Sequence, residues 1–152
     1  KSAAIIINHV GEGLRLAKEF GLPKEVTDCI PQHHGTLILK QFYEEAKKKD
    51  PAIGIKLFRY PGPRPLSREA GLLMLADNAE ARVRALPVKS HELVKEAVEE
   101  AVTERYRERQ LDVAGFTEAD FVKIRDSFTA SLLALHHRRL PRREFVSVPL
   151  HR

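Results

Sequence analysis

The 152-residue chain contains one cysteine, one methionine and no tryptophan. Because Cys29 is alone, no disulfide can form within the chain, and a reducing compartment such as the cytosol is favoured over secretion. Nothing resembles a signal peptide, and no apolar run approaches the roughly 20 residues that a membrane helix needs. We therefore expect a domain that does not cross a bilayer by itself.

The chain has little excess of one charge, with 26 Lys and Arg against 21 Asp and Glu. Much of the net charge of +5 lies in residues 138–152, so the remainder is closer to neutral. Such a balance permits an anionic partner such as a nucleotide, but it falls short of an extended nucleic-acid stripe. We expect no nucleic-acid partner. A basic helical nucleic-acid binder remains a third interpretation, supported only by the pI near 9.5 and the arginine-rich tail.

Strand alternation is almost absent, whereas apolar residues recur at spacings of three and four, which predicts an all-α fold. Pro31 is expected to break the second helix, and the proline-rich segment 51–65 is expected to be a loop. Ser67 is a candidate N-cap, and Thr117 with Asp120 resembles a capping box. The predicted helices span about 2–20, 23–30, 38–49, 67–86, 90–110 and 117–137.

The first helix shows its apolar pattern from the first residues, without an obvious cap. We therefore expect that the chain was cut from something longer. The domain is expected to occupy residues 1–139, followed by a basic tail, residues 140–152, that we expect to be poorly ordered. In the helix over 67–86 the predicted buried stripe is Leu72, Ala76, Ala79, Val83 and Leu86.

His9 is the first candidate functional residue. It lies about 100° around the predicted helix from the apolar stripe, so we expect it to be half buried. Gly11 and Gly13 cost helix stability and suggest that something approaches this helix closely. The alternative is a histidine that merely bonds a carbonyl of its own helix.

The pair His33 and His34 follows Pro31 at a junction between helices, where two imidazoles can face one small volume. Imidazole suits zinc, iron, manganese or similar ions. The same dipeptide at His136 and His137 ends a helix amid arginines, and we interpret it as a solvated helix end outside the site.

Asp77 follows the stripe residue Ala76, so its carboxylate is expected at the edge of the core and needs a partner. A salt bridge to Arg82 or Arg84 is the ordinary interpretation. The other is a metal shared with the three histidines above, which could acidify water and polarise a phosphoryl oxygen.

Several segments together resemble a known family: Asn8-His9-Val10, Gln32-His33-His34-Gly35-Thr36, Phe58-Arg59-Tyr60-Pro61-Gly62-Pro63 and Leu75-Ala76-Asp77-Asn78-Ala79-Glu80-Ala81. In order and rough spacing they are similar to the HD-superfamily phosphohydrolase domain of PgpH-type seven-transmembrane proteins. The resemblance runs from Ser2 to about Arg138. It implies an HD-domain-like helical bundle, here N-terminally incomplete.

The resemblance also implies a function. PgpH-type proteins hydrolyse cyclic di-AMP to linear pApA by metal-activated water, in a cytoplasmic domain attached to the bacterial cell membrane. It implies two divalent transition-metal ions, iron or manganese, in the complete domain. It makes His9, His33 and His34 ligands of one ion, and Asp77 a ligand of the other. Pairing with a second copy, as a homodimer, is left open.

The family's His-Asp dipeptide is absent from this sequence. The chain alone is therefore expected to be inactive, and the alternative is a non-catalytic nucleotide- or protein-binding module that has lost half of the site. In the proline-rich loop, Arg59 and Arg64 could bind phosphate and Tyr60 could offer its face to a base. The alternative there is a rigid connection with solvated arginines.

Overall fold

The computed structural model describes residues 2–137, and in this part of the chain every regular element is helical. The predicted all-α fold is therefore confirmed. The elements are α1 (Ser2–Glu19), α2 (Lys24–Gln32), α3 (Lys40–Lys49), a 3-10 turn η1 (Ile55–Phe58), α4 (Arg68–Ala85), α5 (His91–Arg107) and α6 (Glu118–His137).

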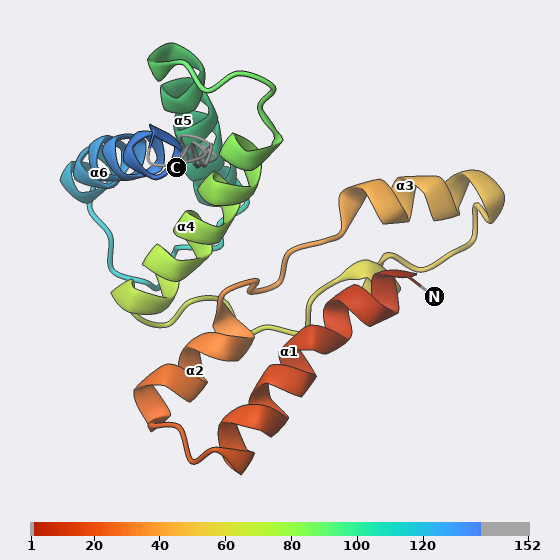
Figure 1. Cartoon of the computed structure of the whole chain (residues 1–152). Helices are drawn as coiled ribbons and strands as arrows, with labels where there is room; N and C mark the ends of the chain where they lie inside the picture. Colours follow the sequence, from red (N-terminus) through yellow and green to blue (C-terminus); the bar gives the residue numbers. More distant parts are fainter. Residues whose placement is uncertain (1, 138–152) are drawn as a thin grey trace, which may run out of the picture.

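Helices α4, α5 and α6 enclose most of the buried apolar side chains (Figure 1). One cluster is centred on Val83, Val94 and Val98, and a second on Met74, Leu75 and Val102. Helices α1 and α2 form a hairpin at the other end of the molecule, and α2 lies against α4. This arrangement places the junction between α2 and α3 directly against the main core.

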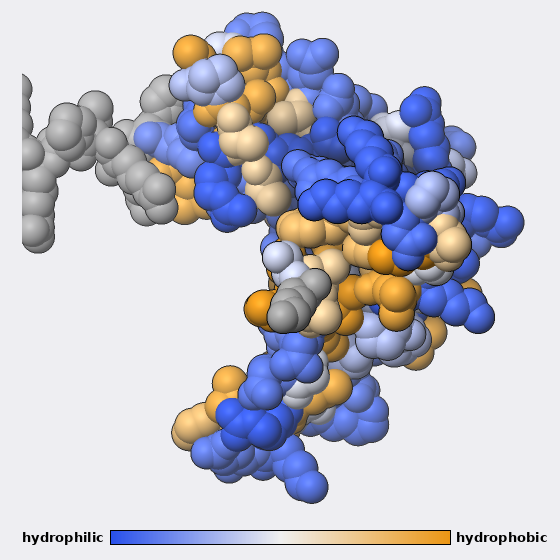
Figure 2. All heavy atoms as spheres, turned by 90° about the vertical axis from the view of Figure 1, so that its right-hand side faces the viewer, coloured by the Kyte–Doolittle hydropathy of each residue, from blue (hydrophilic) through white to orange (hydrophobic). Residues whose placement is uncertain are grey.

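Helix α3 has no buried residue and projects from the body, whereas η1 lies against α1 (Figure 1). Figure 2 shows apolar surface around the start of α1, on the side of the molecule from which α3 projects. Exposed apolar side chains of α1 and η1 include Ile5 and Leu57. Most of the burial therefore lies in α4–α6, and the α1–α3 half depends on specific contacts for its position.

Gly13 permits the close approach of α2 to α1. A Cβ atom added at Gly13 would lie 3.0 Å from Cγ2 of Ile30, which is tighter than ordinary van der Waals contact. The expectation that something approaches this helix closely is therefore correct, and the approaching group is α2. Gly11 has no comparable neighbour outside its own helix.

Two predicted helix boundaries are wrong. Pro31 does not end α2, which continues to Gln32, because a proline in the last turn forfeits one backbone bond while His33 N–H still donates to Cys29 O at 3.0 Å. Ile38 precedes α3 instead of lying in it. It forms an isolated antiparallel bridge with Arg59, and this pairing fastens the α2–α3 junction to the proline-rich loop.

The buried stripe of α4 also differs from the prediction. Leu72 is exposed, whereas Gly71, Met74 and Leu75 are buried. Helix α4 packs against α2 on one side and against α5 and α6 on another, so its buried surface is wider than one amphipathic stripe. Ala79 and Val83 are buried as predicted.

The predicted caps are confirmed. The hydroxyl of Ser67 accepts a hydrogen bond from Ala70 N–H at 3.2 Å. At the start of α6, Thr117 N–H and its hydroxyl both donate to the Asp120 carboxylate at 2.8 Å, and Asp120 N–H donates to the Thr117 hydroxyl at 3.3 Å. This is the reciprocal capping box.

No helix among residues 2–137 has the length and apolarity required to traverse a lipid bilayer. The predicted basic tail, residues 140–152, lies outside the described residues.

Thr117→Ala is expected to lower the free energy of unfolding by about 1 kcal/mol, because it removes the side chain that caps α6. Urea denaturation measures this. Ser127→Ala, at an exposed position within the same helix, is the matched control and should change little. Equal stability of the two variants would contradict the capping role.

The capping contribution is expected to depend on pH. The backbone N–H and hydroxyl of Thr117, together with Arg68, lower the pKa of Asp120 to about 2 from 3.8. A carboxylate whose pKa is lowered by folding stabilises the fold at pH values above its unfolded pKa. This stabilisation is lost as the carboxylate protonates. The difference in melting temperature between wild type and Thr117→Ala should therefore shrink as the pH falls from about 4 to about 2. A constant difference would contradict this assignment.

Candidate metal centre

Three histidines from separate parts of the chain meet in one small volume. His9 lies in the middle of α1, His33 caps the C-terminus of α2, and His34 follows in the turn. The ring centroids of His9 are 5.5 Å from His33 and 4.9 Å from His34. One nitrogen of each imidazole lies within 4.8 Å of the others, the only such group of three possible ligand residues among residues 2–137.

Backbone carbonyls orient two of these rings. His9 Nδ1 bonds to Ile6 O, and His33 Nδ1 bonds to Ile30 O at 2.7 Å. Because a carbonyl can only accept, each Nδ1 carries a proton, and in the neutral imidazole Nε2 then keeps a free lone pair. The two Nε2 atoms lie 3.4 Å apart.

This donor set fits a transition-metal ion. Metal-binding histidines commonly donate the second ring N–H to a carbonyl or carboxylate, which fixes the tautomer and the ring orientation. Two nitrogens that share an ion at about 2.0–2.1 Å in tetrahedral geometry are about 3.3–3.4 Å apart. The spacing between His9 and His33 meets that requirement.

His9 is exposed, so the expectation that it is half buried is wrong. The reason is that α1 packs through Ala3, Val10 and Ala17, which leaves His9 on the rim of that contact. Its bond to Ile6 O is the carbonyl contact of the alternative interpretation, but the ring also faces His33 and His34. The two interpretations therefore coexist in one residue.

His34 lies deeper than His9. Burial, followed by the neighbouring His33, His9 and Arg105, lowers the pKa of His34 to about 3. Its imidazole is therefore neutral near pH 7 and available as a ligand or hydrogen-bond partner. Tyr60 stacks on it with ring centroids 4.3 Å apart.

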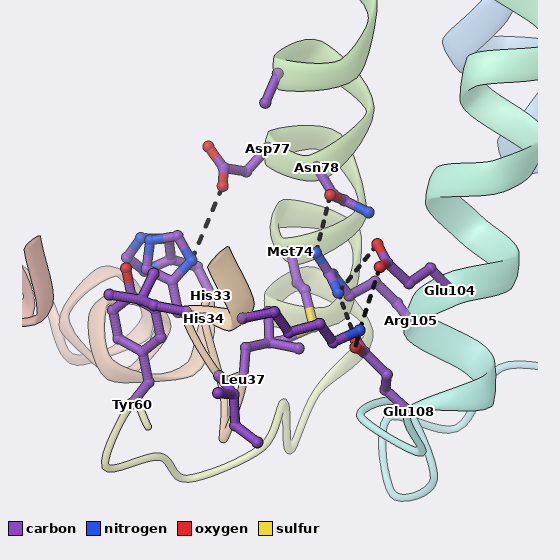
Figure 3. Close-up of a pocket in the computed structure, with 14 residues that line it drawn as sticks. His33, His34, Leu37, Tyr60, Met74, Asp77, Asn78, Glu104, Arg105 and Glu108 are labelled. Atoms are coloured by element: carbon purple, nitrogen blue, oxygen red, sulfur yellow. Dashed lines mark hydrogen bonds and ion pairs between the residues drawn. The ribbon is translucent and has the colours of Figure 1, made fainter. Parts of the chain in front are cut away.

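Asp77 projects from α4 toward the histidines (Figure 3). Its Oδ2 lies 3.9 Å from His34 Nδ1, and half of its side chain is exposed. The predicted alternative partners are engaged elsewhere, because Arg82 pairs with Glu100 and Glu104 and Arg84 pairs with Glu80. Asp77 therefore belongs to the histidine cluster.

The proline-rich loop does not present its three candidate residues together. Tyr60 is only 5% exposed and stacks on His34, so the face that the prediction assigns to a base is covered in this structure. Arg59 donates to Thr36 O at 2.8 Å, which uses part of its guanidinium to hold the loop. Arg64 lies 3.8 Å from Asp112 and remains partly exposed. This geometry favours a mainly structural loop, as the alternative interpretation has it.

A cavity of about 230 Å³ adjoins the histidines (Figure 3). Its histidine end includes Asp77 and Tyr60, and its walls include apolar residues such as Leu37 and Met74. The opposite end carries charged and polar residues that the sequence reasoning missed: Lys40, Asn78, Glu104, Arg105 and Glu108. They come from α3, α4, α5 and the C-cap position of α5, and periodicity alone marks them only as helix surface.

Gln110 holds the turn that carries His34, and no sequence pattern identifies it. Although it is only 4% exposed, its Oε1 accepts from Thr36 N–H at 3.0 Å and its Nε2 donates to Glu108 O at 3.3 Å. Gly35 makes this approach possible: its φ is +50°, and an added Cβ would lie 2.5 Å from Gln110 Oε1. Glycine is thus required by both conformation and space.

The chain has clear relatives, although no protein-family model matches it. It is 38% identical over 144 residues to the uncharacterized protein slr0104 of Synechocystis. It is 34% identical over 139 residues to the cyclic-di-AMP phosphodiesterase PgpH of Bacillus subtilis, and 31% identical over 140 residues to PgpH of Listeria monocytogenes. Each alignment includes 91–92% of this chain but only 18–20% of the relative. The chain thus spans about a fifth of these relatives.

Solved structures also match this chain. The HD domain of L. monocytogenes PgpH in complex with cyclic-di-AMP matches with a TM-score of 0.84 and 30% identity, over 93% of this chain and 66% of that one. A second structure of that domain gives a TM-score of 0.82 over 90% and 64%. The fold and the histidine cluster define an HD-type helical domain. More narrowly, the chain is a homologue of the PgpH HD domain, as the motifs predicted.

Gly35→Ala is expected to lower the free energy of unfolding by at least about 1 kcal/mol, because the new Cβ requires a left-handed conformation and displaces Gln110. Metal affinity should fall as well, since the turn carries His34. Urea denaturation and Mn²⁺ titration measure the two effects. Gly54→Ala is the control, because Gly54 has φ −76° and open space around it. Identical behaviour of the two variants would refute the role of the turn.

Replacing both His33 and His34 by Ala is expected to abolish metal retention, because only one of the three imidazoles, that of His9, remains. Elemental analysis of purified protein after loading with Mn²⁺ and desalting measures this. His91→Ala, at an exposed position that starts α5, is the matched control. Unchanged metal content in the double variant would contradict the assignment of the metal site.

Proposed function

We propose that this chain is part of the catalytic domain of a metal-dependent phosphodiesterase that hydrolyses a cyclic dinucleotide, namely cyclic di-AMP to linear pApA. Water is added across one phosphodiester bond, which opens the ring. Two relatives are named cyclic-di-AMP phosphodiesterases, and the matching solved domain is in complex with cyclic-di-AMP. We further propose that the domain works on the cytoplasmic side of a bacterial membrane.

The observation that carries this proposal is the orientation of the histidines. The free Nε2 atoms of His9 and His33 face each other, and the neutral His34 completes the group. These three residues would hold one divalent ion, iron or manganese. When bound, such an ion supplies Lewis acidity toward a phosphoryl oxygen and acidifies water.

The remaining residues of the site have distinct tasks. Asp77 supplies the nearby carboxylate, which can ligate a second ion or accept a proton. Burial, followed by the charge of Asp77, raises the pKa of Tyr60, so its phenol stays protonated and packs against His34. The stacked ring excludes water from one side of the cluster and limits the rotation of His34.

The His-Asp dipeptide typical of HD domains is absent from this sequence. We propose that two-metal chemistry needs ligands beyond this chain and that the chain alone is inactive. The same absence favours one alternative function, a non-catalytic module that binds a nucleotide or a protein with half of an HD site.

Hydrolysis assays on the full-length protein and on this chain separate the two functions. Both proteins receive Mn²⁺ and cyclic di-AMP, and chromatography measures pApA. The proposal expects about two ions per full-length protein, conversion to pApA, and neither full loading nor turnover for the chain alone. Metal-free, inactive full-length protein that still binds cyclic di-AMP would establish the alternative.

Asp77→Asn is expected to lower the hydrolysis rate of the full-length protein by on the order of a hundredfold, because it removes the carboxylate that we propose ligates the second ion or accepts a proton. Its stability should change by less than about 0.5 kcal/mol, since the side chain is half exposed. Asp126→Asn, exposed on α6, is the control and should leave the rate unchanged. Equal activity of the two variants would refute a role for Asp77.

A further inference from the structure

The far end of the histidine cavity is bordered by an ion pair between Lys40 and Glu108, the C-cap residue of α5. Lys40, the first residue of α3, extends its Nζ to within 2.5 Å of Glu108 Oε1 and 3.5 Å of Glu104 Oε1. Glu108 also pairs with Arg105, which donates to Asn78 Oδ1 at 2.9 Å. The carboxylate is therefore held from both sides (Figure 3).

This ion pair separates three spaces. Lys40 and Glu108 line the histidine cavity of about 230 Å³, an outer cavity of about 640 Å³ between α3 and α5, and a smaller one of about 200 Å³ beside Arg59. Side chains shared by all three form the partition between them. Removing the lysine side chain would join the histidine cavity to its neighbours.

The histidine cavity is small for a dinucleotide. Ligand sites are usually about 300–1,000 Å³, so a space of about 230 Å³ accommodates one nucleoside unit at most. The walls near Leu37 and Met74 are apolar and suit a base, while the histidine end suits a phosphate.

We infer that Lys40 is a specificity-determining residue, which with Glu108 forms the wall that limits the size of the cyclic oligonucleotide the site accepts. This inference rests on the proposed function. Helix α3 has no buried residue of its own, so the Lys40 ion pairs are its main polar contact with the α5 region. These ion pairs keep the wall in place.

The test compares the binding of cyclic di-AMP and cyclic tri-AMP. The two ligands contain the same type of base and the same type of linkage but differ in ring size. Dissociation constants are measured by equilibrium dialysis on full-length protein in EDTA, without Mn²⁺, so that metal-dependent hydrolysis does not consume the ligand, and chromatography verifies that the ligands stay intact. The variant is Lys40→Met, which keeps the aliphatic stem and removes the charge. Circular dichroism checks its folding, and Glu108→Gln weakens the same wall from the other helix.

Size and charge predict opposite results. Cyclic tri-AMP carries one more phosphate, so loss of a lysine charge alone would weaken its binding at least as much as that of cyclic di-AMP. Loss of the wall should instead shift the ratio of dissociation constants toward cyclic tri-AMP by on the order of tenfold. Lys40→Arg should preserve the wild-type ratio. So should Lys47→Met, which removes a charge elsewhere on α3, over the Tyr43 ring.

An unchanged ratio in Lys40→Met and Glu108→Gln, or a shift toward cyclic di-AMP, overturns the inference, and the proposed function stands if the wild type still binds and cleaves cyclic di-AMP. Wild-type protein that binds neither ring overturns both.

Discussion

The insertion of Gln110 against Gly35 is the contact on which the site depends. It joins the turn after α2 to the segment after α5 and fixes the turn against the α4–α6 core through a buried amide. A buried amide without partners would be costly, so its bonds to Thr36 and Glu108 strongly favour one position of the turn. A second buried glutamine, Gln32, accepts from Leu66 N–H at 2.7 Å and fixes the proline-rich loop beside it.

From that fixed turn the electrostatics of the site follow. Desolvation and neighbouring cationic groups keep His34 neutral, while carbonyls hold the protons of His9 and His33 at Nδ1. The Nε2 atoms of His9 and His33 therefore face each other beside the neutral His34. The cluster is arranged to receive a cation, and Asp77 adds negative charge at its edge.

Local patterns predicted the helices and caps because both are set by residues three or four positions apart. Thr117 with Asp120 and Ser67 with Ala70 are examples. The motifs also brought His9, His33, His34 and Asp77 to notice. Long-range contacts had no such signal: Gln110 binds Thr36 across 74 positions, and Lys40 pairs with Glu108 on a distant helix. The exposure of His9 and the burial of Tyr60 could not be predicted from the sequence for the same reason, since both depend on how separate parts of the chain pack.

On this proposal, His9, His33 and His34 together form a metal site held in place by the α2–α3 turn. X-ray diffraction at the manganese absorption edge, on crystals of this chain grown with MnCl₂, tests it most directly. The account predicts an anomalous peak between Nε2 of His9 and Nε2 of His33, within reach of His34. A map without a peak there, or with peaks only at surface carboxylates, would contradict it.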